Sequence, residues 1–200
     1  MKNIRMLILS CLLVLLTTAA CNSAGQPVVA LPVPSATPQA TAEIKSLPTP
    51  MSPTQLVVYD NLQVVMSAAE ITASYPTEFG SNREPPAGKK FLWIHVILKN
   101  MGQKEQDLPA PEHFSALSGT TEFKPTYGHH KDHADYMALT ANMLEGQEVG
   151  AWLRFDISAD AELKDLIFAF LPESTQVSIG FSSSDYFWAD HPIYLWNCAP

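Results

Sequence analysis

Apolar and polar side chains alternate along two long segments of the chain, 91–99 and 149–157. In the first segment Leu92, Ile94, Val96 and Leu98 share one face of an extended chain, and in the second Val149, Ala151, Leu153, Phe155 and Ile157 do so. A period of two is typical of β-strands that bury one face. Both segments are therefore predicted to be long strands, and the turn residues at 100–102 end the first one.

Shorter segments with the composition of strands lie on both sides of these two, at 56–59, 62–73, 114–117, 122–124, 163–170, 176–181 and 193–196. Clusters of glycine, proline, asparagine and aspartate separate them, which is typical of an all-β sandwich. Only residues 132–144 lack alternation and carry helix formers. A short helix or an ordered loop is expected there, and the predicted sandwich domain runs from residue 55 to residue 200.

The first twenty residues follow the pattern of a secretory signal peptide. Lys2 and Arg5 supply positive charge, an apolar run spans residues 6–16, and small residues precede Cys21. The run is too short to span a bilayer as a mature helix. The tetrapeptide 18–21, Thr-Ala-Ala-Cys, resembles the lipobox of bacterial lipoproteins, although Thr18 stands where leucine is most common. The resemblance implies lipid on the Cys21 thiol, and the alternative is an ordinary signal peptide that leaves Cys21 free.

Acyl chains on one cysteine, palmitate among them, form a stable anchor when there are two of them. The mature chain is therefore predicted to be lipid-anchored to the cell membrane and to face the extracytoplasmic side. Residues 21–54 are rich in proline, threonine, serine and alanine. Such a segment cannot bury enough apolar surface to order itself, so it is predicted to be a disordered linker between the anchor and the domain.

Charge and cysteine content narrow the choice of partners. The net charge is −8, and cleavage after Ala20 removes two basic residues, so the mature chain is more acidic still. This acidity argues against nucleic acid as a partner. With Cys11 lost in the leader and Cys21 lipidated, Cys198 has no intrachain disulfide partner. We expect Cys198 to be buried rather than bonded to a second chain, because no basic residue flanks it to favour a thiolate.

Turn and core positions of the domain resemble a known family. They are Pro-Ala-Gly-Lys-Lys-Phe-Leu at 86–92, Lys-Asn-Met-Gly at 99–102, Phe-Ser-Ala-Leu at 114–117, the segment 119–125, Leu-Glu-Gly-Gln-Glu-Val at 144–149, Trp-Leu-Arg-Phe-Asp-Ile at 152–157, and the segment 163–168. Their order and spacing resemble the domain-of-unknown-function 4352 family of bacterial exported lipoproteins, which is similar to a secreted immunoprotective antigen. The resemblance implies an immunoglobulin-like antiparallel β-sandwich with no established catalytic residues. Two parts depart from the family pattern, a histidine-bearing insertion at 128–143 and an aromatic tail at 185–200.

The insertion holds the densest group of chemistry-bearing side chains, namely His129, His130, Asp132, His133 and Asp135. Imidazole and carboxylate are ligands for zinc and copper. On a helical turn His133 shares a face with His129 or His130, whereas an extended chain turns His129 and His130 to opposite sides. A transition-metal site, a pH-sensing group of imidazoles and a polar surface loop all stay open, and the surface loop is favoured.

The aromatic tail offers Trp188, Tyr194 and Trp196 as candidates for a binding surface. The strand character of residues 193–196 favours packing against the sandwich instead. In that arrangement Trp93 and Trp152, which fall on the faces opposite the alternating core residues, rest against the tail.

Sequence signatures of common enzymes are missing from the chain. The predicted function is therefore a non-catalytic, membrane-anchored module that needs no cofactor and binds a protein, a peptide or an envelope component. The alternative is an envelope lipoprotein that binds zinc or copper through His129, His130 and His133.

Overall fold

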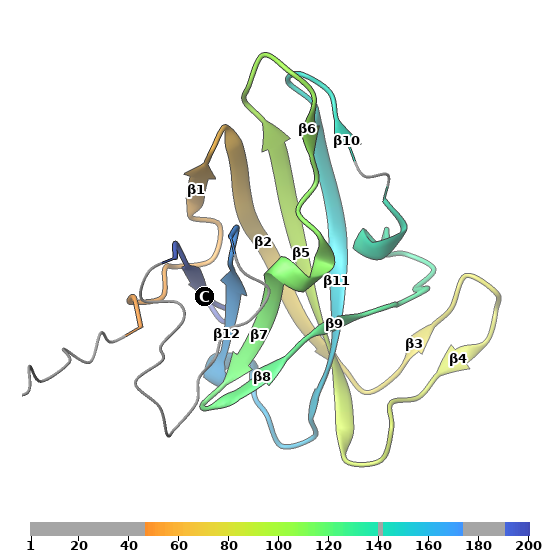
Figure 1. The fold of residues 1–200 in the computed structure, drawn as a ribbon. Coiled ribbons are helices and arrows are strands. Elements are labelled where there is room, and N and C mark those ends of the chain that lie inside the picture. The colour runs from red at the N-terminus through yellow and green to blue at the C-terminus, as the bar shows by residue number, and fades with distance from the viewer. Residues whose placement is uncertain (1–46, 140–141, 174–190) are drawn as a thin grey trace, which may run out of the picture. The chain divides into compact units, whose positions relative to one another are not determined.

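Two long strands, β5 (Lys89–Asn100) and β11 (Glu148–Ser158), pair along their whole length in the computed structural model of the chain. On the other side of β5 lie β2 (Leu62–Thr72) and then β1 (Leu56–Tyr59), and beyond β11 lies β9 (Pro125–Thr126). The five strands form one antiparallel sheet, which runs through the middle of Figure 1. The structure describes residues 47–139, 142–173 and 191–200.

A second antiparallel sheet has the order β13 (Tyr194–Asn197), β12 (Leu166–Phe170), β7 (Phe114–Ser118) and β8 (Thr121–Phe123). Two short pairs extend the structure, β3 (Tyr75–Pro76) with β4 (Asn82–Arg83) and β6 (Gln106–Asp107) with β10 (Asn142–Met143). Helix in the described residues is confined to three 3-10 turns, η1 (Pro111–His113), η2 (Tyr136–Ala138) and η3 (Leu163–Asp165). No helix among these residues is long and apolar enough to cross a membrane.

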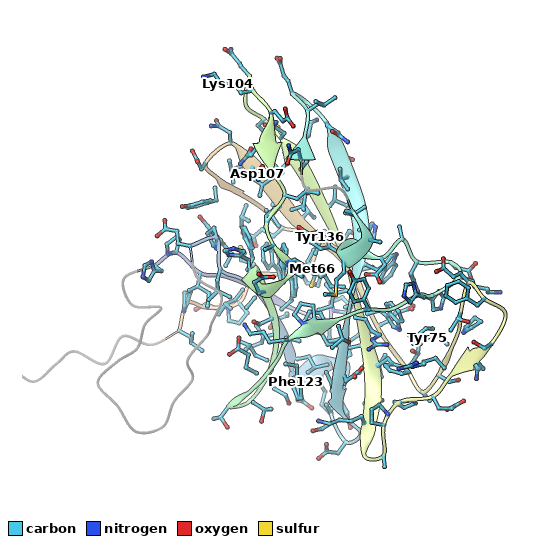
Figure 2. The ribbon with its side chains drawn as sticks, turned by 45° about the vertical axis from the view of Figure 1, so that its right-hand side comes forward. Met66, Tyr75, Lys104, Asp107, Phe123 and Tyr136 are labelled. Atoms are coloured by element: carbon cyan, nitrogen blue, oxygen red, sulfur yellow. The ribbon has the colours of Figure 1, made fainter. Side chains whose placement is uncertain are left out.

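The main core lies between the two sheets. The first sheet contributes Ile94, Leu153 and Phe155, and the second contributes Phe168 and Trp196, all at most 1% exposed. Met66 and Tyr136, labelled in Figure 2, belong to the same core. Alternation along β5 and β11 places Ile94, Leu153 and Phe155 on the inner face of the first sheet, as the period of two predicts. The predicted all-β sandwich is confirmed.

Strand boundaries follow the predictions closely, with one exception. The predicted strand 163–170 begins with η3, where the Asp165 N–H donates to the Glu162 carbonyl at 3.0 Å, and β12 starts only at Leu166. The predicted strand 176–181, the signal peptide, Cys21 and most of the linker lie outside the described residues.

The end of the predicted linker belongs to the folded unit. Met51 donates its N–H to the Leu195 carbonyl at 2.8 Å and accepts from the Asn197 N–H at 2.9 Å, and the Thr54 N–H donates to the Met66 carbonyl at 2.8 Å. The Met51 side chain packs against the main core. By its contacts the chain divides into residues 1–41 and 42–200. The predicted boundary at residue 54 is therefore too late, because proline-rich composition hid a segment that pairs with β13.

Replacement of Trp196 by alanine should lower the free energy of unfolding by about 3–5 kcal/mol. Trp196 is fully buried, and its Nε1 donates to the Gln55 carbonyl at 2.8 Å. Urea unfolding of the full-length protein, followed by circular dichroism, measures the change. Leu144→Ala is the control, because Leu144 is 65% exposed and its loss should cost less than about 0.5 kcal/mol. Equal midpoints for the two variants would contradict the burial of β13.

Candidate functional site

The outer face of the five-stranded sheet carries an aromatic cluster of Tyr75, Phe91, Trp93 and Trp152. Residues 127–135, here called the His loop, cover this cluster. The chain leaves the edge of β11 after β9, crosses the sheet face, and returns where Asp135 bridges Trp152. The Trp152 N–H donates to the Ala134 carbonyl at 2.8 Å. The first part of the predicted insertion thus covers a second, smaller apolar core, whereas Tyr136 and Met143 belong to the main core.

Asp135 closes the His loop at its base. Its Oδ2 accepts from the Gly128 N–H at 2.9 Å, and its Oδ1 accepts from the Met137 N–H at 3.0 Å. Between these points the loop pairs with the β3–β4 segment, because the Glu78 N–H donates to the His129 carbonyl at 3.1 Å. The loop is therefore held at both ends and along its length.

Arg154 joins the sheet to the segments that cover it. Although it lies on the outer face of β11, Arg154 is only 6% exposed. Its Nη1 donates to the Tyr75 hydroxyl at 2.9 Å, and its Nε and Nη2 donate to Thr126 Oγ1 at 2.9 and 2.6 Å. Asp156 lies 3.4 Å from Nη2 and balances the buried charge. A sequence pattern that places Arg154 on the solvent side of a strand gives no sign of this role.

His133 and His130 point inward, onto the indoles. The His133 ring stacks on Trp93 at 4.9 Å between centroids and lies 4.0 Å from the Trp152 ring and 3.9 Å from the His130 ring. Its Nε2 is 3.3 Å from a Glu70 carboxylate oxygen, while its buried Nδ1 has no hydrogen-bond partner. Burial, reinforced by His130, lowers the pKa of His133 to about 4. The ring is therefore neutral at neutral pH and packs as an aromatic side chain.

His129 points the opposite way, into solvent. Its Nδ1 lies 3.0 Å from a Glu78 carboxylate oxygen, and its ring is flanked by Tyr127 at 5.9 Å and Phe79 at 5.7 Å. Phe79 is 77% exposed and Tyr127 54% exposed. His129 and His130 thus point to opposite sides of the loop, and the loop presents two exposed aromatic rings beside the contact between His129 and Glu78.

The structure does not bring the side chains of the alternative zinc or copper site together as one group. In the part of the chain that the structure describes, no three histidine, cysteine or acidic side chains form a group that could hold a metal ion. Asp132 faces solvent and pairs with Lys131 at 3.7 Å, and both oxygens of Asp135 accept backbone hydrogen bonds. The favoured surface-loop interpretation is also incomplete, since His130 and His133 pack over the aromatic cluster.

A serine–histidine contact on the same face escaped the sequence analysis. Ser67 lies at a bulge in β2, and its Oγ is 2.5 Å from Nδ1 of His95. Burial lowers the pKa of His95, whose ring packs 4.9 Å from that of Trp152. Among the described residues, no carboxylate hydrogen-bonds the other ring nitrogen, so the third group that orients a catalytic histidine is not found there. A bulge of one residue leaves no trace in a period of two, which is why the pair was missed.

The described part of the aromatic tail, residues 191–200, packs against the sandwich, as the strand character of residues 193–196 indicates. Trp196 is fully buried in the main core, which removes it from the candidate binding surface, and half-buried Tyr194 stacks 6.1 Å from Phe170. Trp188 lies outside the described residues. The described end of the tail, residues 191–200, does not cover Trp93 and Trp152, because β13 belongs to the other sheet and the His loop covers these two indoles.

Cys198 is buried and free, as predicted, and burial raises the pKa of its thiol to about 12. The thiol is therefore protonated under physiological conditions, and a role as a reactive thiolate is not favoured.

The protein is thus a β-sandwich in which the histidine rings of one loop pack on the indoles of the outer sheet face. No protein-family model matches the chain, and no curated protein matches it in sequence. Membership of the domain-of-unknown-function 4352 family therefore stays a prediction.

Comparison with solved structures finds similar β-rich chains at low sequence identity. The yjhA protein of Bacillus subtilis has a TM-score of 0.49 and 13% identity over 73% of this chain and 97% of its own. An uncharacterized β-sandwich protein of Clostridium difficile has a TM-score of 0.43 and 11% identity over 76% of this chain and 97% of its own. The secreted protein MPT63 of Mycobacterium tuberculosis has a TM-score of 0.44 and 9% identity over 76% of this chain and 99% of its own.

Gly128→Ala should lower the free energy of unfolding by about 1–3 kcal/mol. A Cβ at this position would lie 2.5 Å from Cη2 and 2.8 Å from Cζ3 of Trp93, so the loop must lift or the indole must move. Trp93→Phe removes both atoms, and the added cost of Gly128→Ala should shrink in the double variant. A strictly additive double-mutant cycle from urea unfolding would refute this contact.

Acidification should weaken the attachment of the His loop. An unfolded chain protonates His133 near its ordinary pKa of 6.5, whereas the folded chain does so only near 4. Between these values the unfolded state binds more protons, so the stabilisation is complete above about pH 6.5 and is lost as the pH falls toward about 4.

The pH dependence is measured as the difference in free energy of unfolding between wild type and His133→Gln, at about pH 7.5 and about pH 4.5. Wild type should lose about 2 kcal/mol more than the variant over this range. His129→Gln is the control, since the His129 side chain is 51% exposed, and it should keep the wild-type dependence. The same pH dependence in wild type and His133→Gln would rule out His133 as the group responsible.

Proposed function

We propose that this protein is a lipid-anchored, extracytoplasmic lipoprotein whose β-sandwich is a non-catalytic binding module. The observation that carries the proposal is the N-terminal pattern of two basic residues, an apolar run and small residues directly before Cys21. A cysteine at that place is the acceptor for lipid, and the proline-rich segment after it tethers the domain at a distance from the bilayer.

The placement of the chemistry-bearing side chains supports a binding role rather than a catalytic one. His130 and His133 are used to pack the His loop onto the indoles, and Asp135 is used to close the loop. Arg154 donates its hydrogen bonds to Tyr75 and Thr126, inside the molecule. A rigid sandwich with firmly held loops is suited to presenting fixed surfaces to a partner.

Cys21→Ser should abolish lipid attachment. When wild type and variant are each expressed in a bacterial host, wild type should be found in the membrane fraction and Cys21→Ser should not. Metabolic labelling with an alkyne-tagged palmitate, followed by mass spectrometry of the N-terminal peptide, measures the modification. Cys198→Ala is the matched control and should keep full labelling, because Cys198 is buried in the domain. An unmodified N-terminus, or membrane association that survives Cys21→Ser unchanged, would count against the anchor.

A further inference from the structure

A cavity of about 330 Å³, here called the edge groove, opens between the two sheets beside the β1–β2 turn. The turn forms one wall with Tyr59, Asp60 and Leu62, and the opposite wall includes Leu108 and Phe170. The β1–β2 turn and β6 both lie in the upper half of Figure 1. This volume falls within the range of about 300–1,000 Å³ that is usual for ligand sites.

The edge groove has an apolar floor and an acidic mouth. Leu62 and Phe170 are buried, and Leu108 packs against the main core. Asp60 and Asp107, in contrast, are exposed, and the described residues that line the groove include no lysine or arginine. The Tyr59 hydroxyl donates to a Glu173 carboxylate oxygen at 2.6 Å, which brings a third carboxylate close to the same wall. An apolar group with a positive charge beside it complements this surface.

A second cavity of about 550 Å³ adjoins the edge groove and shares Asp60 and Gln106 with it. Gln106 Nε2 donates to the Asp60 carbonyl at 3.1 Å and marks the boundary between the two. The second cavity is lined mostly by polar residues from the turn after β5, Lys104 among them, and Figure 2 shows Lys104 and Asp107 at the same end of the molecule. Two adjoining cavities give an elongated footprint, which suits an extended peptide better than a compact small molecule.

The acidic mouth is rigidly built. Asp60 and Asn61 have φ angles of 43° and 65°, which is the geometry of a tight two-residue hairpin turn. The Met101 N–H donates to the Asn61 carbonyl at 2.7 Å and fixes the turn to the end of β5. Because the backbone of Asp60 is fixed before binding, little backbone entropy is lost when a cation meets its carboxylate.

We propose that the edge groove binds an extended segment of a partner protein, with an apolar side chain on the floor and a lysine or arginine next to it at the mouth. The inference rests on the proposed function as a binding module and names its site and its class of ligand. An anionic lipid surface or an acidic peptide would meet the carboxylates of Asp60 and Asp107 with the same sign of charge, which disfavours both.

A fluorescent peptide tests the proposal directly. Acetyl-Gly-Lys-Leu-Lys-Gly-amide, labelled at one end, is titrated with full-length protein in detergent micelles, and anisotropy reports binding. Saturable binding is expected, with a loss of at least about tenfold when leucine is replaced by serine or when both lysines are replaced by glutamate. Absence of saturable binding overturns the proposal. Equal binding of the glutamate peptide also overturns it, because the groove would then select only the apolar group.

Variants of the edge groove test the contributions of its apolar floor and of its acidic mouth separately. Ala110→Phe fills the cavity that Ala110 lines, and Asp60→Asn with Asp107→Asn removes the charge at the mouth. Each should weaken binding at least about tenfold. The matched control is Asp160→Asn with Asp165→Asn, which makes the same charge change at exposed sites outside the groove lining and should leave affinity within about twofold. Unfolding midpoints equal to wild type confirm that each variant is folded.

Two further outcomes keep this inference distinct from the proposed function. A dimer in sedimentation that is lost in Ala110→Phe would assign the groove to a second copy of the chain and overturn the partner peptide. A partner captured from envelope extract equally well by wild type and Ala110→Phe would leave the proposed function standing and overturn the edge groove as its site. Absence of lipid on Cys21 in the wild-type protein would do the reverse, because it would overturn the membrane anchor and leave the edge groove standing.

Discussion

The antiparallel pairing of β5 with β11 is the constraint on which the rest of the structure depends. These two strands carry large apolar side chains on both faces, with Ile94 and Phe155 on one side and Trp93 and Trp152 on the other. A sheet of this kind has to be covered twice. The four-stranded sheet covers the inner face, and the His loop with the β3–β4 segment covers the outer one. The loop is therefore part of the fold, although its composition is that of an exposed segment.

The alternation of apolar and polar residues predicts the long strands and the sandwich, because every second residue of each long strand is apolar and faces the core. It did not predict the cover of the outer face. The alternation places Trp93 and Trp152 on the face opposite the core. Their partners, His130 and His133, are distant in sequence and contact them only after folding. The spacing of the histidines also suggested a metal site that the described residues do not assemble. Spacing describes which residues can share a face, and it cannot tell whether a neighbouring indole already occupies that face.

The other discrepancies also come from pairings that short segments make without a repeating pattern. Met51 sits among prolines and serines, and nothing in its neighbourhood indicates that it pairs with β13. Asp60 and Asn61 are residues typical of a turn and can be predicted as one. The acidic mouth of the edge groove also needs Asp107, which β6 places in the same lining as Asp60. His130 and His133 thus pack on the aromatic cluster of the outer face, whereas Asp60 and Asp107 are exposed at the edge groove. The two imidazoles hold the His loop in place, and the two carboxylates are the groups that the proposed partner would meet.

The two backbone hydrogen bonds between Met51 and β13 join the segment that leads into the domain to the second sheet. With the lipid anchor proposed above, a pull on the linker would reach the domain from its N-terminal side. It would load Met51, whose two backbone hydrogen bonds run to Leu195 and Asn197. The Thr54 N–H also donates to the carbonyl of Met66 in β2, which lies in the core. The segment ahead of β1 is thus bonded to both sheets, so a pull along the linker would act on both of them before it reached β1.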